Sequence, residues 1–173
     1  MAWQDQVAGE LGEPPVGGGL DVVHRWYGHT VWPLLGHTGV AALHLSGASE
    51  AVWRETLEPA LLDLYRRAYP YAQAYATASA AAGGFALSHG YSETEATEYG
   101  ETYAAMNTDA NVKAHAEANA AANAAALAAA FAAGDEAAYA ATYPGAFVRA
   151  CVLAGGPGAR ERLAAGLRES VTP

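Results

Sequence analysis

The sequence predicts an all-α protein, a helical bundle built around one long alanine-rich central helix at about residues 93–133 with shorter flanking helices. Three observations predict this fold class. In "SETE" (92–95), Ser92 and Glu95 have the spacing of a capping box that opens a helix, and nothing after them stops that helix before Gly134. Residues 53–68 carry apolar side chains at helical spacing. Isoleucine is missing, and no run of Val or Thr alternates with polar residues, as half-buried strands require.

The N-terminal region contains the stretch "GEPPVGGG" (12–19), which is typical of a flexible hinge. We therefore expect residues 1–19 to be a flexible, loosely attached arm and residues 20–173 to form a single α-helical domain. Within residues 20–46, "LDVVHRWY" and "GVAALHL" are compatible with short helices. The residues expected to interrupt a continuous helix there are Gly28, Pro33, Gly36 and Gly39.

The next two predicted helices are separated by a proline. Ser49 is a suitable N-cap for a helix that carries the apolar stripe of residues 53–68. Pro59 should kink this helix, and Pro70 should break or bend it. The following "YAQAYATASAAAGGFALSHG" should continue helically to about residues 83–84.

Shorter helices follow the long one. Asp135 can cap a helix that ends near residues 143–145. A further helix is expected over residues 146–154, and the "GGPG" of residues 155–158 should end it. The last predicted helix covers residues 159–169.

The chain is acidic, with 18 Asp and Glu against nine Lys and Arg, for a net charge of −9. This balance argues against nucleic acid or an anionic membrane surface as the main partner. The N-terminus lacks the basic start and apolar run of a signal peptide, and the most apolar window, residues 120–133, is too short to span a bilayer. We therefore expect a soluble cytoplasmic protein. The bias toward Ala, Gly and Arg with almost no Lys suggests a bacterial origin.

The long helix carries an unusual row of side chains at four-residue intervals, here called the Tyr/Asn/His row. Its members are Tyr99, Tyr103, Asn107, Asn111, His115, Asn119 and Asn123, followed by Leu127 and Phe131. Asn is a poor helix former because its amide competes for backbone hydrogen bonds, so this repetition needs a reason. The charges, among them Asp109, Lys113 and Glu117, lie about 200° around the helix. We therefore expect the Tyr/Asn/His row to point inward, with tyrosines of residues 65–75 as hydrogen-bond partners.

Two interpretations of this row remain open. In the first, it forms an inter-helix or inter-subunit hydrogen-bond network that fixes register, as single buried Asn residues do in coiled coils. In the second, it lines a polar pocket or channel for a small molecule. His115 would then be a general base, Tyr99 or Tyr103 an acid or oxyanion donor, and Asn111 and Asn119 orienting groups.

A ligand, if one binds, should lie at the N-terminal end of the row. The apolar Leu127 and Phe131 should close the other end, whereas the glycines of "GGFALSHGYSE" could permit an opening. The expected lining is Tyr99, Tyr103, Asn107, Asn111 and His115, with Tyr71, Tyr75 or His89 as opposing walls. An apolar body with a few hydrogen-bonding groups suits such a lining.

These expectations give two functional hypotheses. One is a small enzyme without an organic cofactor that acts on a small organic molecule by proton transfer, as an isomerase, lyase or cyclase does. The other is a non-catalytic ligand-binding or self-assembling helical protein in which the same row is packing. Self-association into a homo-oligomer is expected in either case, because alanine-faced helices bury little area alone.

Other reactive groups give weaker signals. Four histidines, His24, His29, His37 and His44, lie within one stretch, but their spacing does not place two metal ligands on adjacent helical turns, so we expect no metal site. The single cysteine, Cys151, lies in an apolar helical stretch and is expected to be a buried small hydrophobe. Lys113, the single lysine, lies in the charged row and is expected to face solvent.

Overall fold

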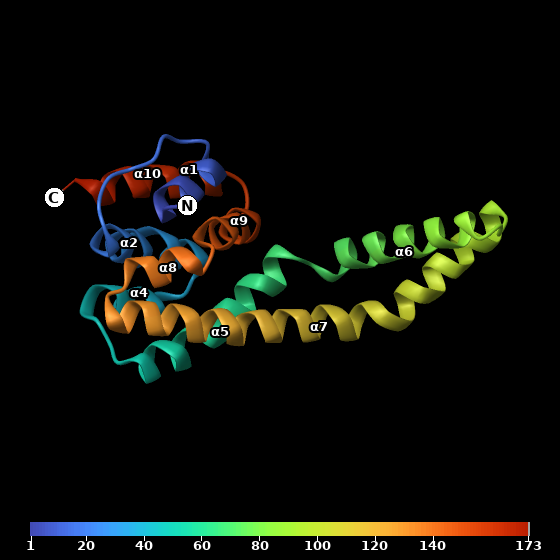
Figure 1. The fold of residues 1–173 in the computed structure, drawn as a ribbon, viewed down its shortest axis with the longest axis horizontal. Helices are drawn as coiled ribbons and strands as arrows, with labels where there is room; N and C mark the ends of the chain where they lie inside the picture. The colour runs from blue at the N-terminus through green and yellow to red at the C-terminus, as the bar shows by residue number, and fades with distance from the viewer. Residues whose placement is uncertain (173) are drawn as a thin grey trace. The chain divides into compact units, whose positions relative to one another are not determined.

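The computed structural model describes residues 1–172, and within them it contains helices and no strand (Figure 1). The elements are α1 (Trp3–Leu11), α2 (Leu20–Trp26), the π-helical turn η1 (Tyr27–Val31), α3 (Trp32–Leu35), α4 (Thr38–Ser46), α5 (Glu50–Ala68), α6 (Tyr71–Ser88), α7 (Glu93–Ala133), α8 (Glu136–Ala141), α9 (Pro144–Ala154) and α10 (Ala159–Val171). The all-α fold and the long central helix are confirmed.

The predicted start of α7 is confirmed by its capping box. The backbone N–H of Ser92 donates to Glu95 Oε2 at 2.9 Å, and the backbone N–H of Glu95 approaches Ser92 Oγ at 3.4 Å. The Ser92 hydroxyl also donates to Glu95 Oε2, at 2.7 Å. This bond and the bond from the Ser92 backbone N–H lower the pKa of the Glu95 carboxyl, because they favour its charged form. Gly134, with φ of 62°, follows the last residue of α7.

Most of the residues that the sequence predicts to interrupt a helix before α5 do not interrupt one. Residues 20–35 are helical throughout, because the π-helical turn carries the backbone past Gly28 and Pro33 lies in the first turn of α3, where it is tolerated. Gly36, with φ of 87°, ends this segment, and Gly39 lies inside α4. Pro59 lies inside α5, which remains one helix.

The chain divides into two compact units, where the sequence predicts one domain. Residues 1–68 together with the chain from residue 119 onward form the first unit, here called the body. Residues 69–118 form the second, here called the hairpin. The helix α7 contributes residues 93–118 to the hairpin and residues 119–133 to the body.

The N-terminal segment is part of the body and not the loosely attached arm that its glycine-rich flank predicts. Trp3 and Val7 of α1 are fully buried, and α1 packs on α9. The Trp3 indole N–H donates to Glu136 Oε1 at 3.0 Å, which links α1 to α8. The "GEPPVGGG" stretch is therefore a connection between two packed helices.

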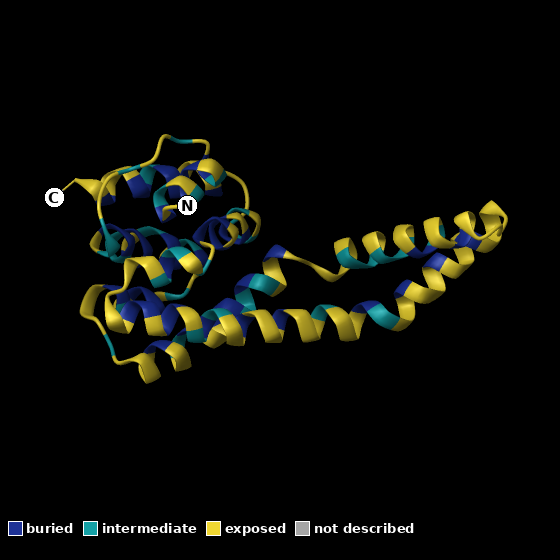
Figure 2. Ribbon diagram, viewed as in Figure 1, coloured by how far each residue is buried: buried dark blue, intermediate teal, exposed yellow. Residues whose placement is uncertain are grey.

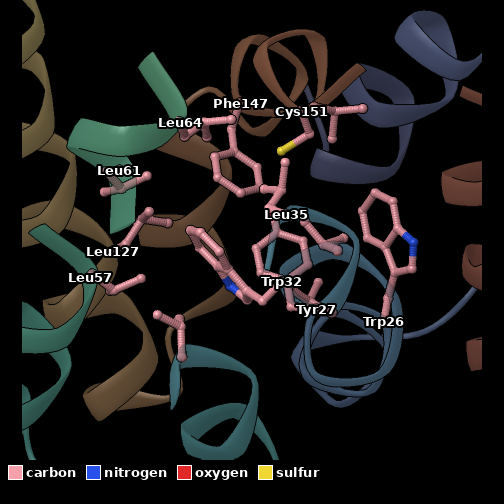
Figure 3. Packing of buried hydrophobic residues seen from close by; sticks show 14 of the residues in the cluster. Trp26, Tyr27, Trp32, Leu35, Leu57, Leu61, Leu64, Leu127, Phe147 and Cys151 are labelled. Carbon is pink, nitrogen blue, oxygen red and sulfur yellow. The ribbon is translucent and has the colours of Figure 1, made fainter. Parts of the chain in front are cut away.

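The body has an aromatic and leucine-rich core (Figure 3). Tyr27 and Trp32 from the N-terminal helices contact Phe147 of α9, and Trp26 packs against Tyr27. Leucines of α5 belong to the same cluster, in which all four tryptophans of the chain are buried. Cys151 is fully buried in this core, and burial raises the pKa of its thiol far above the ordinary range. The expectation that Cys151 is a buried small hydrophobe is thereby confirmed. No helix within residues 1–172 is both long and apolar enough to cross a membrane.

The hairpin consists of α6 and the first part of α7, which run antiparallel (Figure 1). The helices approach closely: a Cβ atom added at Gly100 would lie 2.5 Å from the carbonyl oxygen of Ser79, and one added at Gly83 would lie 3.2 Å from that of Ala96. The Tyr75 hydroxyl donates to the Glu101 carbonyl oxygen at 3.2 Å. Only small residues permit this backbone contact.

Few residues of the hairpin are buried, and all of them are small (Figure 2). They are Ala82, Ala86, Ala96, Gly100, Ala104, Thr108 and Ala116. Most of the large apolar and aromatic side chains of the hairpin are exposed, whereas Tyr75 and Val112 are half-buried. The exposed ones include Tyr69, Tyr71, Phe85, Leu87, Tyr91, Tyr99, Tyr103 and Met106.

Candidate functional site

The Tyr/Asn/His row does not point inward within the hairpin. The buried row of α7 begins one residue further on, at Ala96, and continues through Gly100, Ala104 and Thr108 to Ala116. The reason is steric: Gly100 and Ala96 of α7 lie directly against the backbone at Ser79 and Gly83 of α6, and only small side chains let the two backbones approach this closely. The expected inward orientation is therefore corrected, since side chains of the row face outward.

The residues proposed for catalysis are exposed. Tyr99 and Tyr103 have exposed fractions of 41% and 45%, and His115 is exposed. Asn111 and Asn119 are also exposed, and Asn107 is half-buried, with its amide donating to the Tyr103 carbonyl oxygen at 2.8 Å. These side chains form no enclosed lining around His115.

One amide of the row makes the expected bond to a tyrosine. Asn123, which lies in the body, donates to the Tyr65 hydroxyl oxygen of α5 at 2.6 Å. This pair links α5 to the second part of α7 and supports the interpretation of the row as an inter-helix network at that end.

The residues proposed as opposing walls have local roles. Tyr71 is exposed, and its ring centroid lies 5.9 Å from that of Tyr75. His89 is at the C-cap of α6, where Nδ1 lies 2.8 Å from the Phe85 carbonyl oxygen and the imidazole lies over the Phe85 ring with centroids 4.0 Å apart. A turn-and-cap role therefore accounts for His89.

A surface hollow of about 870 Å³ lies elsewhere, in the body. Trp3 and Gln6 of α1, Glu136 of α8 and Tyr143 line it, and none of the predicted site residues takes part. The hollow is open and largely apolar, and the ligand placement made from the sequence does not coincide with it.

The charge distribution distinguishes two sides of the hairpin. Helix α6 has 18 residues and no charged one. On α7, Glu101, Asp109, Lys113 and Glu117 lie one residue after the buried row, whereas Tyr99 to His115 lie one residue before it. Because successive residues are about 100° apart, the two rows flank the buried row on opposite sides. The row before the buried one begins with Glu95 in the first turn of α7 and carries no charged residue from Tyr99 to His115. We call this part, with Tyr99, Tyr103, Asn107, Asn111 and His115, together with the adjoining side of α6, the uncharged face.

A second polar arrangement lies in the body, where His44 of α4 bonds to two side chains. The Trp32 indole N–H donates to His44 Nε2 at 3.1 Å, and His44 Nδ1 lies 2.9 Å from His24 Nδ1. We call these three residues the His24–His44–Trp32 chain. His44 is buried and His24 half-buried.

The π-helical turn positions two members of this chain. On an ideal α-helix, His24 and Trp32 would point about 80° apart, because they are separated by eight residues. The wider turn of η1, between them, rotates the backbone less per residue and brings both side chains to His44. Sequence spacing alone therefore missed this contact, since π-helical turns have no clear sequence signature.

The other two histidines of the stretch lie apart from this chain. His29 is exposed, and His37 Nε2 lies 2.9 Å from Asp63 Oδ2. Within residues 1–172, no group of three or more His, Cys, Asp and Glu side chains is arranged to hold a metal ion.

Fold and geometry together define an all-helical protein with a tightly packed aromatic body and a thin alanine-rich hairpin. No protein-family model, curated protein or solved structure matches the chain.

Proposed function

We propose that the protein is a self-assembling helical protein whose hairpin docks, through its uncharged face, against the same face of a second copy. The observation that supports this proposal is the distribution of side chains in the hairpin, which buries small residues and exposes large ones. Its buried residues are all small, while most of its large aromatic and apolar side chains are exposed, with Met106 at 77% and Phe85 at 55%. Two alanine-rich helices bury too little area to be stable alone, so a covering surface is expected.

The charge of the hairpin favours one orientation of the second copy over the other. Residues 69–118 contain six acidic residues and one lysine, for a net charge of −5 with His neutral. Pairing through the uncharged faces turns the acidic rows of both copies away from each other. Pairing through the charged faces would bring like charges together, which is unfavourable.

The size of the surface is sufficient for a weak to moderate dimer. Helix α6 has 18 residues and is about 27 Å long, and two adjacent helices are about 20 Å wide, so the face measures about 500 Å². Two such faces bury about 1,000 Å² in total, near the lower limit for specific interfaces. The product is a four-helix arrangement, which gives each hairpin the layer of packing that it lacks.

The polar groups of the uncharged face suit a symmetric interface. In an isologous contact, each residue meets a counterpart from the other copy, so Asn amides and Tyr hydroxyls can donate and accept reciprocally. This is the inter-subunit form of the hydrogen-bond network expected from the sequence. The alternative, proton transfer by His115 with Tyr99 or Tyr103, requires a site that excludes water, and the exposure of these residues gives it no support.

The proposal is tested by sedimentation velocity on the full chain at micromolar concentrations. We expect a dimer that Asn111→Glu weakens at least tenfold in Kd, because the substitution places two carboxylates in the interface. The matched control is Ala105→Glu, at another exposed position of α7 but in the charged row, which should leave Kd within about twofold. A monomer at all concentrations, or equal weakening by both variants, would contradict the proposal.

A further inference from the structure

The hydrogen-bond roles within the His24–His44–Trp32 chain follow from chemistry. An indole N–H can only donate, so His44 Nε2 must accept from Trp32. The proton of a neutral His44 is then on Nδ1, from which it is donated to His24 Nδ1. His24 in turn keeps its own proton on Nε2. With both imidazoles neutral, every bond in the chain has one donor and one acceptor.

One added proton is incompatible with this arrangement of donors and acceptors. If His24 becomes doubly protonated, its Nδ1–H points at the Nδ1–H of His44 across 2.9 Å. If His44 then moves its proton to Nε2, that N–H meets the indole N–H of Trp32 across 3.1 Å. Either arrangement leaves two donors facing each other away from water, which is costly.

The rings that surround His44 carry no negative charge that would pair with an added proton. Around it lie the rings of Trp53 from α5, Phe131 from α7 and Tyr27 from η1, with centroids 4.7, 5.0 and 5.1 Å away. Burial, and then the neighbouring His24, lower the pKa of His44 well below its ordinary value.

His24 is the outer member of the chain. Burial lowers its pKa, and the charge of Asp21 on the same helix opposes this effect without overcoming it. Asp21 is itself paired with Arg25 at 3.1 Å. His24 also contacts Trp53 and Phe131, with ring centroids 6.1 and 5.1 Å away.

The element held by the chain is α4, which is short and is connected through glycines at both ends. Gly36 before it and Gly47 after it have φ of 87° and 74°, and neither has a neighbour within 4 Å of an added Cβ. His44 lies in the last turn of α4, so its bonds to His24 and Trp32 fasten this helix to α2 and α3. Neither glycine is crowded by neighbouring atoms, so packing at these two positions does not oppose a change in their backbone conformation.

We propose that the His24–His44–Trp32 chain is a proton-sensitive latch, which holds α4 against α2 and α3 when both imidazoles are neutral and releases α4 when the chain takes up a proton. The release exposes His44 to water, where both ring nitrogens can donate. This inference concerns the body and does not depend on assembly through the hairpin.

Hydrogen exchange of the full chain at about pH 7.5 and about pH 5.5 tests the latch, with rates corrected for the intrinsic effect of pH. The open population of residues 38–46 should rise by up to about tenfold for each histidine that is neutral when closed and titrates near 6.5 when open. His24→Asn offers an amide oxygen where Nδ1 lies and does not titrate, so the part of the rise that comes from His24 should disappear and the larger part, which comes from His44, should remain. His29→Asn is the matched control at an exposed histidine and should behave as the wild type.

Two results would overturn the latch. One is an unchanged open population of residues 38–46 at the lower pH, or a rise shared equally by every helix of the body. The other comes from nitrogen NMR of the wild-type imidazoles above neutral pH, which requires no variant to fold. It should show the His44 proton on Nδ1 and the His24 proton on Nε2, and the opposite assignment for His44 would refute the chain.

Discussion

Thr108 occupies an unusual position among the small buried residues of the hairpin. Its Oγ1 is buried without a hydrogen-bond partner, whereas the Thr97 hydroxyl on the same helix donates to the Glu93 carbonyl oxygen at 2.8 Å. A buried hydroxyl that bonds to nothing costs about 1–3 kcal/mol relative to one that is satisfied.

We expect Thr108→Val to stabilise the hairpin by about 1 kcal/mol, because it keeps the side-chain shape and removes the unpaired hydroxyl. The free energy of opening of residues 93–118, measured by native-state hydrogen exchange, reports this change. Thr97→Val, at an exposed and bonded threonine, should have an effect below about 0.5 kcal/mol. A loss of stability in Thr108→Val would show that the hydroxyl has a partner.

Single residues also show where sequence reasoning reached its limit. The sequence predicts that one i, i+4 row of α7 faces the interior, but two parallel rows share this spacing, and the more polar of them is the one expected to be buried. Gly100 distinguishes them, because it falls in register with Ala96 and Ala104 and marks the row where a backbone must come close. A glycine within a long alanine-rich helix is therefore the sequence feature that identifies the buried row.

At the scale of the helical elements, the contact between α6 and α7 depends on that glycine. A Cβ at Gly100 would lie 2.5 Å from the Ser79 carbonyl oxygen, and backbone atoms cannot yield cheaply. Gly84, on α6, has no neighbour within 4 Å of an added Cβ and lies in helical backbone. The two positions form a matched pair, because the same substitution should decrease the stability of the hairpin at one position and increase it at the other.

Gly100→Ala should destabilise the hairpin by about 1–3 kcal/mol through overpacking, whereas Gly84→Ala should stabilise it by about 0.5–1 kcal/mol through helix propensity. Urea unfolding followed by far-UV circular dichroism measures the change. Tryptophan fluorescence provides an internal control, because all four tryptophans lie in the body and their transition should not move. Equal destabilisation by both variants would mean that the close approach is absent.

The helical elements were largely predictable because their signals are local. The capping box of Ser92 and Glu95 and the break at Pro70 required no tertiary knowledge. The burial of α1 and the bond between His24 and His44 are different, since each depends on contacts with segments far along the chain. Propensity and spacing describe neighbours in sequence, and they carry no information about which distant helix will cover a given face.

For the whole molecule, we expect the free energy of unfolding to decrease as the pH falls. A histidine whose pKa is lowered by folding stays neutral in the body and becomes charged on unfolding. Its contribution is fully present above the unfolded pKa of about 6.5 and is lost as pH falls below that value. His24 and His44 are both of this type. The carboxyls of Glu10 and Asp63 have lowered pKa values, so their contribution to the free energy of unfolding is lost as the pH falls below about 4.5.

We expect the free energy of unfolding of the body to fall by about 1.4 kcal/mol per pH unit below about pH 6.5 from His44 alone, with a smaller addition from the partly exposed His24. Urea titrations followed by tryptophan fluorescence at several pH values measure this slope. His44→Gln, which can still accept from Trp32, should flatten it. A slope that is unchanged in this variant would assign the acid sensitivity to other groups.

The body is formed from two segments of chain that flank the hairpin, and this has a kinetic consequence. Pairs such as Tyr65 with Asn123 are separated by 58 positions, so the closing of a long loop opposes their formation. The hairpin contacts are far more local, and an antiparallel pair of helices returns the chain toward its starting point. A hairpin that forms early therefore shortens the effective loop, and the speed with which the aromatic core assembles depends on residues that take no part in that core.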